Sequence, residues 1–215
     1  TGLRNTLIGA LAGDAVIGSD DHVFVGYLAG SSVTTGINNT LIGSHSGDAL
    51  VAGTRNVAIG YASLGLDTTG SHSTALGYLA LDAQNFTSAV DTFNVAVGSS
   101  AGSAVTTGVQ NTLIGGLAGD ALTDADLNVA IGYNALAIDT LGSKSVAVGD
   151  GALVRQNFTS ATDSYNVAVG NDAGKGLTTG RFNVVMGARN LYSGTSTCDG
   201  GTFIGYGSGG NSGGV

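Results

Sequence analysis

The sequence predicts an all-β fold: a parallel β-solenoid (β-roll) with about twelve 17-residue coils. A five-residue pattern that ends in Gly recurs at positions 9, 26, 43, 60, 77, 98, 115, 132, 149, 170, 187 and 205. Eight of the eleven spacings between these positions equal 17, two equal 21 and one equals 18. The chain has 38 Gly, no Pro and 15 acidic residues, all of them Asp, which favours turns over helices. Such regular spacing indicates one solenoid coil per repeat.

Each coil is expected to form a strand in the residues that precede its Gly. Counting this Gly as zero, position −3 is always Val or Thr and position −1 is always aliphatic or Met, so both point to one face. Position +10 is Gly in six coils, often after Thr-Thr, which predicts a second short strand between glycine turns. Stacked in parallel at about 4.8 Å, twelve coils predict a rod of roughly 50 Å.

Position −2 lies on the opposite face of the strand and is also apolar in every coil. A thin solenoid can bury one face of this strand inside its own coil. The other face would then expose an apolar stripe that is larger than monomers usually leave in contact with water. We therefore expect the −2 row to be the contact face of a homo-oligomer, with three-fold cyclic symmetry favoured. The row consists of Leu7, Phe24, Leu41, Ala58, Ala75, Ala96, Leu113, Ala130, Ala147, Ala168, Val185 and Phe203.

Position −4 is Asn in eight of the twelve coils. Stacked Asn amides can bond to one another along a fibre, and Asn also suits the turn that leads into a strand, so two explanations stay open. Neither makes the row a binding site. The ladder would consist of Asn5, Asn39, Asn56, Asn94, Asn111, Asn128, Asn166 and Asn183.

A second, 72-residue period lies above the coil repeat, because positions 39–98 and 111–170 match at 37 of 60 positions. Each unit contains one long coil, at 77–98 and 149–170, whose four extra residues must bulge outward as a loop. These loops are expected to carry any receptor or glycan contact, through Asn85, Phe86, Thr87 and Ser88 and through Asn157, Phe158, Thr159 and Ser160. Alternatively, each Phe packs over the side of the solenoid as a plug. Asn38, Asn85 and Asn157 also match the N-glycosylation pattern.

Enzymatic chemistry is not expected. His22, His45 and His72 occupy different coil positions, so neither a metal cluster nor a catalytic group of histidines is predicted. No cofactor is expected. The net charge of −8 with seven scattered cations argues against nucleic acid, and no apolar run is long enough to insert into a membrane.

The segments NVAIGYNAL (128–136), NTLIGGLAGDAL (111–122) and SVAVGDGAL (145–153) resemble the repeats of phage and prophage tail fibres. They are also similar to the head repeats of trimeric autotransporter adhesins, although those coils are commonly shorter. The resemblance implies a trimeric parallel β-roll with a role in attachment, outside the cell, as part of a virion or a cell surface.

The expected function is therefore that of a structural and attachment fibre without catalytic activity, which associates with itself and contacts cell-surface glycans or receptors. A cellular surface adhesin or extracellular filament is the main alternative. An ice-binding solenoid is a more remote one, suggested by the recurring Thr-Thr-Gly turns. The solenoid region is expected to span residues 1–206, followed by a Gly- and Ser-rich end or linker at 207–215.

Overall fold

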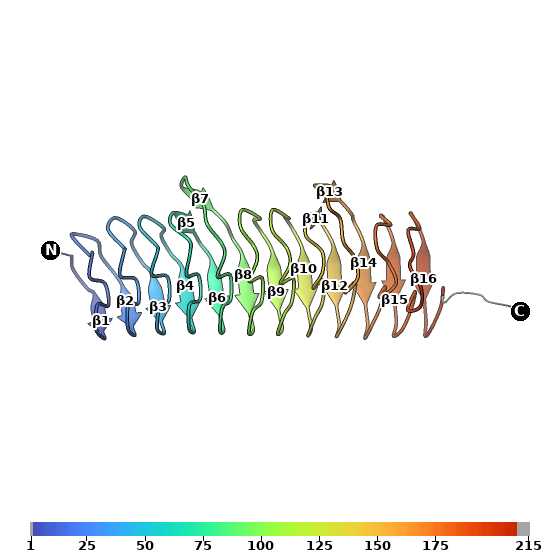
Figure 1. The fold of residues 1–215 in the computed structure, drawn as a ribbon, viewed down its shortest axis with the longest axis horizontal. Coiled ribbons are helices and arrows are strands. Elements are labelled where there is room, and N and C mark those ends of the chain that lie inside the picture. Colours follow the sequence, from blue (N-terminus) through green and yellow to red (C-terminus); the bar gives the residue numbers. More distant parts are fainter. Residues whose placement is uncertain (1, 210–215) are drawn as a thin grey trace, which may run out of the picture.

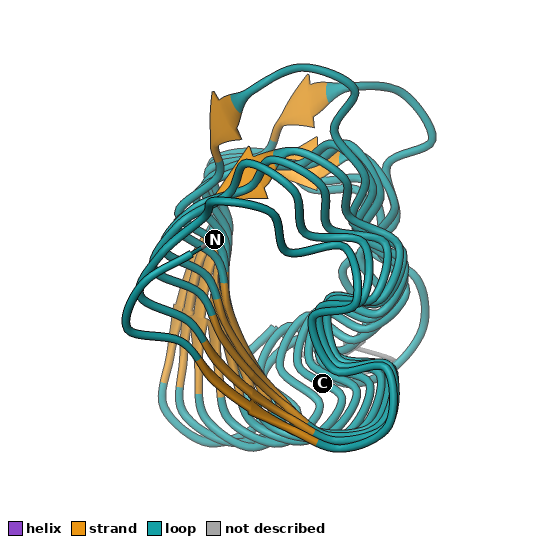
Figure 2. Cartoon of the chain, turned by 90° about the vertical axis from the view of Figure 1, so that its left-hand side faces the viewer, coloured by secondary structure: helices purple, strands orange, loops and turns teal. Residues whose placement is uncertain are grey.

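The computed structural model describes residues 2–209 and confirms the all-β fold, a parallel β-solenoid of about twelve coils (Figure 1). One three-residue strand per coil joins a twelve-stranded parallel sheet that forms one side of the rod (Figure 2). Successive strands pair in register, so residues of equal repeat position lie side by side. The strands of this sheet are β1 (Thr6–Ile8), β2 (Val23–Val25), β3 (Thr40–Ile42), β4 (Val57–Ile59), β6 (Thr74–Leu76), β8 (Val95–Val97), β9 (Thr112–Ile114), β10 (Val129–Ile131), β12 (Val146–Val148), β14 (Val167–Val169), β15 (Val184–Met186) and β16 (Thr202–Ile204).

The second strand that was predicted for each coil forms only around the two long coils. There, β5 (Gly70–Ser71) pairs with β7 (Val90–Asp91), and β11 (Gly142–Ser143) pairs with β13 (Thr162–Asp163). The other coils of the described region turn through bends at this point and satisfy their backbone through hydrogen bonds to the next coil, as Thr34 N does to Val51 O. Residues 207–209, which were expected to begin a linker, continue the twelfth coil, because Ser208 N donates to Asn190 Oδ1. Residues 210–215 lie outside the described residues.

The prediction that the −2 row faces a partner is wrong. Every −2 side chain from Phe24 to Val185 is fully buried inside its own solenoid. Only the two end coils differ, with Leu7 exposed and Phe203 half-buried. Strand alternation then turns positions −3 and −1 outward, and none of those 24 side chains is buried. The face that was expected to be internal is therefore the outer surface of the sheet.

In most coils, positions −2 and +4 of the interior exchange large and small residues. Where −2 is Phe24, Leu41 or Leu113, position +4 is Gly, and a Cβ at Gly30 would lie 2.6 Å from the Phe24 ring. In the coils of β8 and β14, Ala at −2 coincides with Gly at +4, and a Leu of the preceding coil lies against that Gly. In the coils of β4, β6, β10 and β12, Ala at −2 coincides with a buried Leu at +4. These leucines are Leu64, Leu81, Leu136 and Leu153, and each has a positive φ of 50–55°. Left-handed backbone costs a Leu roughly 1–2 kcal/mol, which burial of its side chain offsets.

The Gly at position zero is required by the distance between coils. Gly132 has a φ of +135°, and a Cβ there would lie 2.5 Å from the carbonyl oxygen of Gly149 in the next coil. The same contact recurs from Gly9 to Gly187, at 2.3–2.7 Å to the oxygen of the following Gly. Any side chain at this position would force the coils apart.

We expect Gly132→Ala to destabilise the fold by more than about 3 kcal/mol, because it combines backbone strain with a clash against backbone. Gly116→Ala is the matched control, since its φ lies outside the left-handed region and its nearest neighbour would lie 3.5 Å away. That variant should change stability by less than about 1 kcal/mol. Thermal and guanidinium unfolding followed by circular dichroism will measure both. Equal losses in the two variants would contradict the assigned role of the inter-coil contact.

Candidate functional site: the two long-coil loops

The two long-coil loops project beyond the rest of the rod, as predicted (Figures 1 and 2). Within the first loop, Asn85, Thr87 and Ser88 are exposed, whereas Phe86 is only 6% exposed. The second loop is similar, with Phe158 also 6% exposed and with Thr159 and Ser160 at the surface, but Asn157 is half-buried where Asn85 is exposed. The two Phe rings therefore pack as plugs, and a direct receptor contact through them does not fit their burial.

A buried carboxylate holds the base of each loop. Asp67 Oδ1 accepts hydrogen bonds from the backbone N–H groups of Gly70 (3.0 Å) and Phe86 (3.3 Å). Its Oδ2 accepts from Gln84 Nε2 (2.6 Å), and Gln84 Oε1 accepts from Asn94 Nδ2 (2.9 Å). The Asp, Gln and Asn side chains are fully buried, so the loop leaves the solenoid over a polar section of its core.

The same clamp recurs at the second loop. Asp139 Oδ1 accepts from Gly142 N (3.1 Å) and Phe158 N (2.9 Å), and its Oδ2 accepts from Gln156 Nε2 (2.6 Å). Burial raises the pKa of Asp139, while the hydrogen bonds from Gln156 and the backbone oppose this shift. The role of Asp67 and Asp139 was not predicted from the sequence. A signal was present, because both clamps place Asp and Gln where other coils have Val or Leu.

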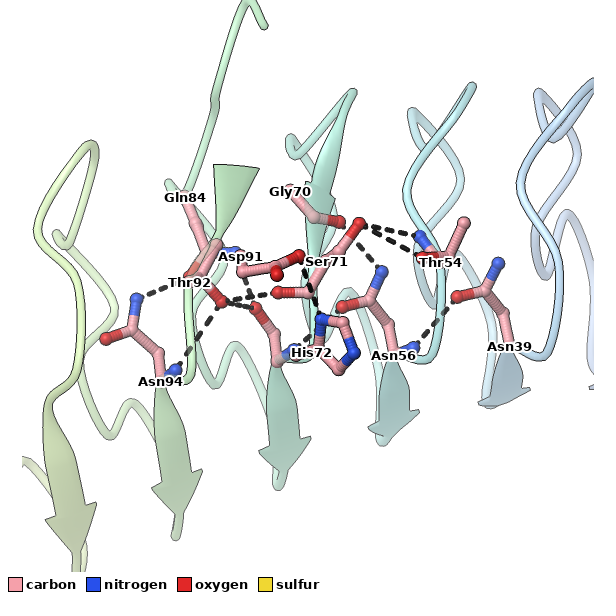
Figure 3. A network of polar contacts seen from close by, with 11 residues as sticks. Asn39, Thr54, Asn56, Gly70, Ser71, His72, Gln84, Asp91, Thr92 and Asn94 are labelled. Atoms are coloured by element: carbon pink, nitrogen blue, oxygen red, sulfur yellow. Dashed lines mark hydrogen bonds and ion pairs between the residues drawn. The ribbon is translucent and has the colours of Figure 1, made fainter. Parts of the chain in front are cut away.

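The Asn row forms a ladder inside the solenoid, and Figure 3 shows part of it. Asn56 N donates to Asn39 Oδ1 (2.9 Å), and Asn56 Nδ2 donates to Gly70 O (2.9 Å). Each amide thus satisfies one backbone N–H and one backbone carbonyl of neighbouring turns. Direct bonds between amide groups also occur, as from Asn183 Nδ2 to Asn166 Oδ1 (3.1 Å). Seven of the eight predicted ladder residues are fully buried, Asn5 being the half-buried end, so the row is structural.

His22 takes the place of Asn in the second coil. Its Nδ1 accepts a hydrogen bond from Asn39 N (3.3 Å), its Nε2 lies 3.1 Å from Ser19 Oγ, and its ring stacks on Phe24. Acceptance at Nδ1 requires the neutral ring, and burial lowers the pKa of His22 although Asp20 and Asp21 oppose the shift. The other two histidines lie elsewhere, with His45 between Tyr27 and Tyr61 and His72 paired with Asp91.

A hollow of about 660 Å³ lies beside the second loop. Asp126 and Ser143 contribute from neighbouring coils, and Thr162 and Asp163 contribute from β13. The exposed rings of Tyr165 and Phe182 line it with Asp124, Ala161 and Arg181. The sequence did not predict this site, because its residues come from four coils and belong to different repeat positions.

Ion pairs at the hollow are superficial. Lys144 Nζ lies 2.5 Å from Asp163 Oδ2 and 5.2 Å from the centroid of the Tyr165 ring. Its hydrogen bond lowers the pKa of the Asp163 carboxyl, so both partners remain charged at neutral pH. Within residues 2–209, no group of three or more His, Cys or Asp side chains could hold a metal ion, and no helix is long and apolar enough to span a membrane.

No protein-family model matches this chain, and no match was found among curated proteins or solved structures. The resemblance to fibre repeats therefore stays a sequence-based expectation.

His22 predicts a pH dependence of stability. Because its folded pKa lies below the ordinary value of 6.5, its contribution is fully present above pH 6.5 and is lost as pH falls through the folded pKa. His22 should therefore contribute a fall in melting temperature between about pH 7.5 and about pH 5, a range that brackets the ordinary His pKa. The raised pKa of Asp139 contributes in the opposite direction, so the effect of His22 is measured as a difference between variants.

His22→Asn should reduce this drop, because Asn at this repeat position accepts the same backbone hydrogen bond in other coils. His45→Asn serves as the control for loss of a histidine outside the ladder and should keep the parent slope. The assignment fails if His22→Asn and the parent lose equal stability over this range.

Proposed function

We propose that this chain is a non-enzymatic structural and attachment fibre, a shaft that associates with copies of itself and lies outside the cell. One observation carries the proposal, namely the outer sheet face. We define this face as positions −3 and −1 of the twelve strands, which contain only Val, Thr, Ile, Leu and Met. Ile114 is 37% exposed and Ile131 is 36% exposed, in the middle of the rod.

An exposed face of this kind favours a partner. Two uncharged rows over roughly 50 Å of sheet amount to several hundred Å², above what monomers usually leave open. Side chains in each row repeat at about 4.8 Å, and a partner that interdigitates along the whole length must have the same repeat. Another copy with a parallel axis meets this condition, and cyclic symmetry closes the assembly, with three copies as the resemblance implies.

The resemblance to phage tail-fibre repeats favours a virion fibre, with a cellular surface adhesin or filament as the alternative. Ice binding is less well supported, because the first Thr of each Thr-Thr-Gly turn uses its hydroxyl in a hydrogen bond to the next coil. Thr106 Oγ1 donates to Thr123 O (3.2 Å), and Thr178 Oγ1 donates to Ser196 O (3.1 Å). A fibre shaft should show no thermal hysteresis, whereas an ice-binding protein should.

We expect the parent chain to have a solution mass near three times 21.0 kDa by light scattering. Ile131→Glu should release monomers, because it places a charge in the middle of the outer sheet face. Ile138→Glu is the matched control, since Ile138 is 47% exposed but belongs to a turn at position +6 on another side of the coil. A monomeric parent, or equal dissociation of both variants, would contradict assembly through this face.

A further inference from the structure

We infer that the hollow beside the second long-coil loop is a binding site for a neutral saccharide. The inference rests on the proposed attachment function and gives that function a specific site. A volume of about 660 Å³ is in the range of small-molecule sites. The site combines free carboxylate oxygens with exposed aromatic rings, two features that suit the polar and apolar sides of a sugar ring.

The carboxylates offer hydrogen-bond acceptors to hydroxyl groups. Asp124 uses Oδ1 to accept from Thr107 Oγ1 (2.7 Å), and Asp126 uses Oδ1 to accept from Val109 N (2.8 Å). Among the described residues, neither Oδ2 has a donor. Because both carboxylates are anchored through one oxygen, the other is positioned toward a ligand with little loss of side-chain entropy.

The aromatic wall is built by two neighbouring coils. Tyr165 is 47% exposed and Phe182 is 51% exposed, with ring centroids 5.5 Å apart and planes inclined by 12°. Because the rings stack on each other and Lys144 lies over Tyr165, their exposed edges are what can pack against the C–H groups of a pyranose. Arg181 lies over the Phe182 ring at 5.4 Å and adds N–H donors for ring or hydroxyl oxygens.

Charge decides between saccharide classes. The lining carries three carboxylates, at Asp124, Asp126 and Asp163, and one cation, Arg181. The ion-pair partners Lys144 and Asp199 cancel each other, so the formal balance of the hollow is −2. A uronic or sialic acid would meet net repulsion, whereas a neutral sugar would not.

The 72-residue duplication singles out this loop. Both long coils keep the buried clamp, in which an Asp accepts a hydrogen bond from a Gln one coil further on. Four residues around the hollow have diverged instead, whereas Ser143, Ala161 and Asp163 match their equivalents in the first copy. Asp124, Asp126, Arg181 and Phe182 correspond to Ala52, Thr54, Val109 and Gln110 in the first copy. The scaffold is thus the same at both loops, while only the second carries these ligand-binding groups.

This divergence supplies the test. The swap variant D124A/D126T/R181V/F182Q inserts residues that the same fold already holds at the equivalent positions of the first copy. It should therefore fold, with the melting temperature and solution mass of the parent. The control variant H72K/F93Y changes the first loop toward the second and leaves the hollow intact.

Saturation-transfer NMR with methyl glycosides of glucose, galactose, mannose and N-acetylglucosamine at about 10 mM will detect dissociation constants near 1 mM. The parent and the control should transfer saturation to the ring protons of at least one glycoside. The saturation-transfer signal of the swap variant should be at least about five-fold weaker. Methyl glucuronide should bind less than methyl glucoside. Absence of transfer to every glycoside, or equal transfer in the swap variant, overturns the site.

The outcome is independent of assembly. A chain that forms the expected oligomer and binds none of the glycosides keeps the proposed fibre and loses the site. A monomeric chain that binds a glycoside only through the hollow keeps the site and loses the proposed assembly.

Discussion

Each coil must stack on the preceding coil at the distance that separates two hydrogen-bonded β-strands, and the rest of the structure depends on this constraint. The closest approach occurs at the Gly of position zero, where backbone meets backbone and a Cβ would lie 2.3–2.7 Å from the next carbonyl oxygen. Because the approach is equal in successive coils, residues of equal repeat position form rows along the rod. A single buried Asn amide would satisfy only its own turn, but Asn at the same position of successive coils forms a continuous hydrogen-bonded ladder. Insertions cannot enter the stack, so the four extra residues of a long coil leave it as a loop.

The stack tolerates buried polar groups only where each of them is satisfied. The clamp at each long coil places Asp, Gln and Asn amide or carboxylate groups in the interior, and every one of these has partners at 2.6–3.3 Å. Burial of such a network costs desolvation free energy, which its hydrogen bonds offset. Loss of one member is destabilising, because the remaining buried groups keep their desolvation penalty without a hydrogen-bond partner. Its repetition at Asp67 and Asp139 indicates that the loop and its polar base form one unit. Surface residues around that unit are free to change, and at the second loop they have done so.

Much of this architecture could be predicted from the sequence. The spacing of Gly indicated the number of coils, and the 21-residue spacings located the loops. The Asn row allowed a ladder as one of two explanations. The inward face could not be identified from apolarity, because positions −2 and −1 are both apolar and position −3 is Val in seven coils and Thr in five. A different signal was available: large residues at −2 coincide with Gly at +4, and Ala at −2 usually coincides with Leu, as in Ala58 with Leu64. Exchange of volume between two positions indicates that both share one enclosed space. The hollow could not be predicted, because the path of the loop brings together residues from four coils that occupy different repeat positions.

Inversion of the two faces strengthens the case for self-association. The interior rows vary from Ala to Phe and fit only their own coil, whereas the outer rows are nearly uniform in size. The β-propensity of Val, Ile and Thr favours them at these positions, but a solitary rod would still gain solubility from an occasional Lys or Asp among the 24 positions of the outer sheet face. The turns bordering this face do carry charge, as at Arg4 with Asp21 and Lys144 with Asp163. Charge is thus permitted by the coil geometry close to the sheet, and its absence from the outer sheet face is what a partner on that face would require.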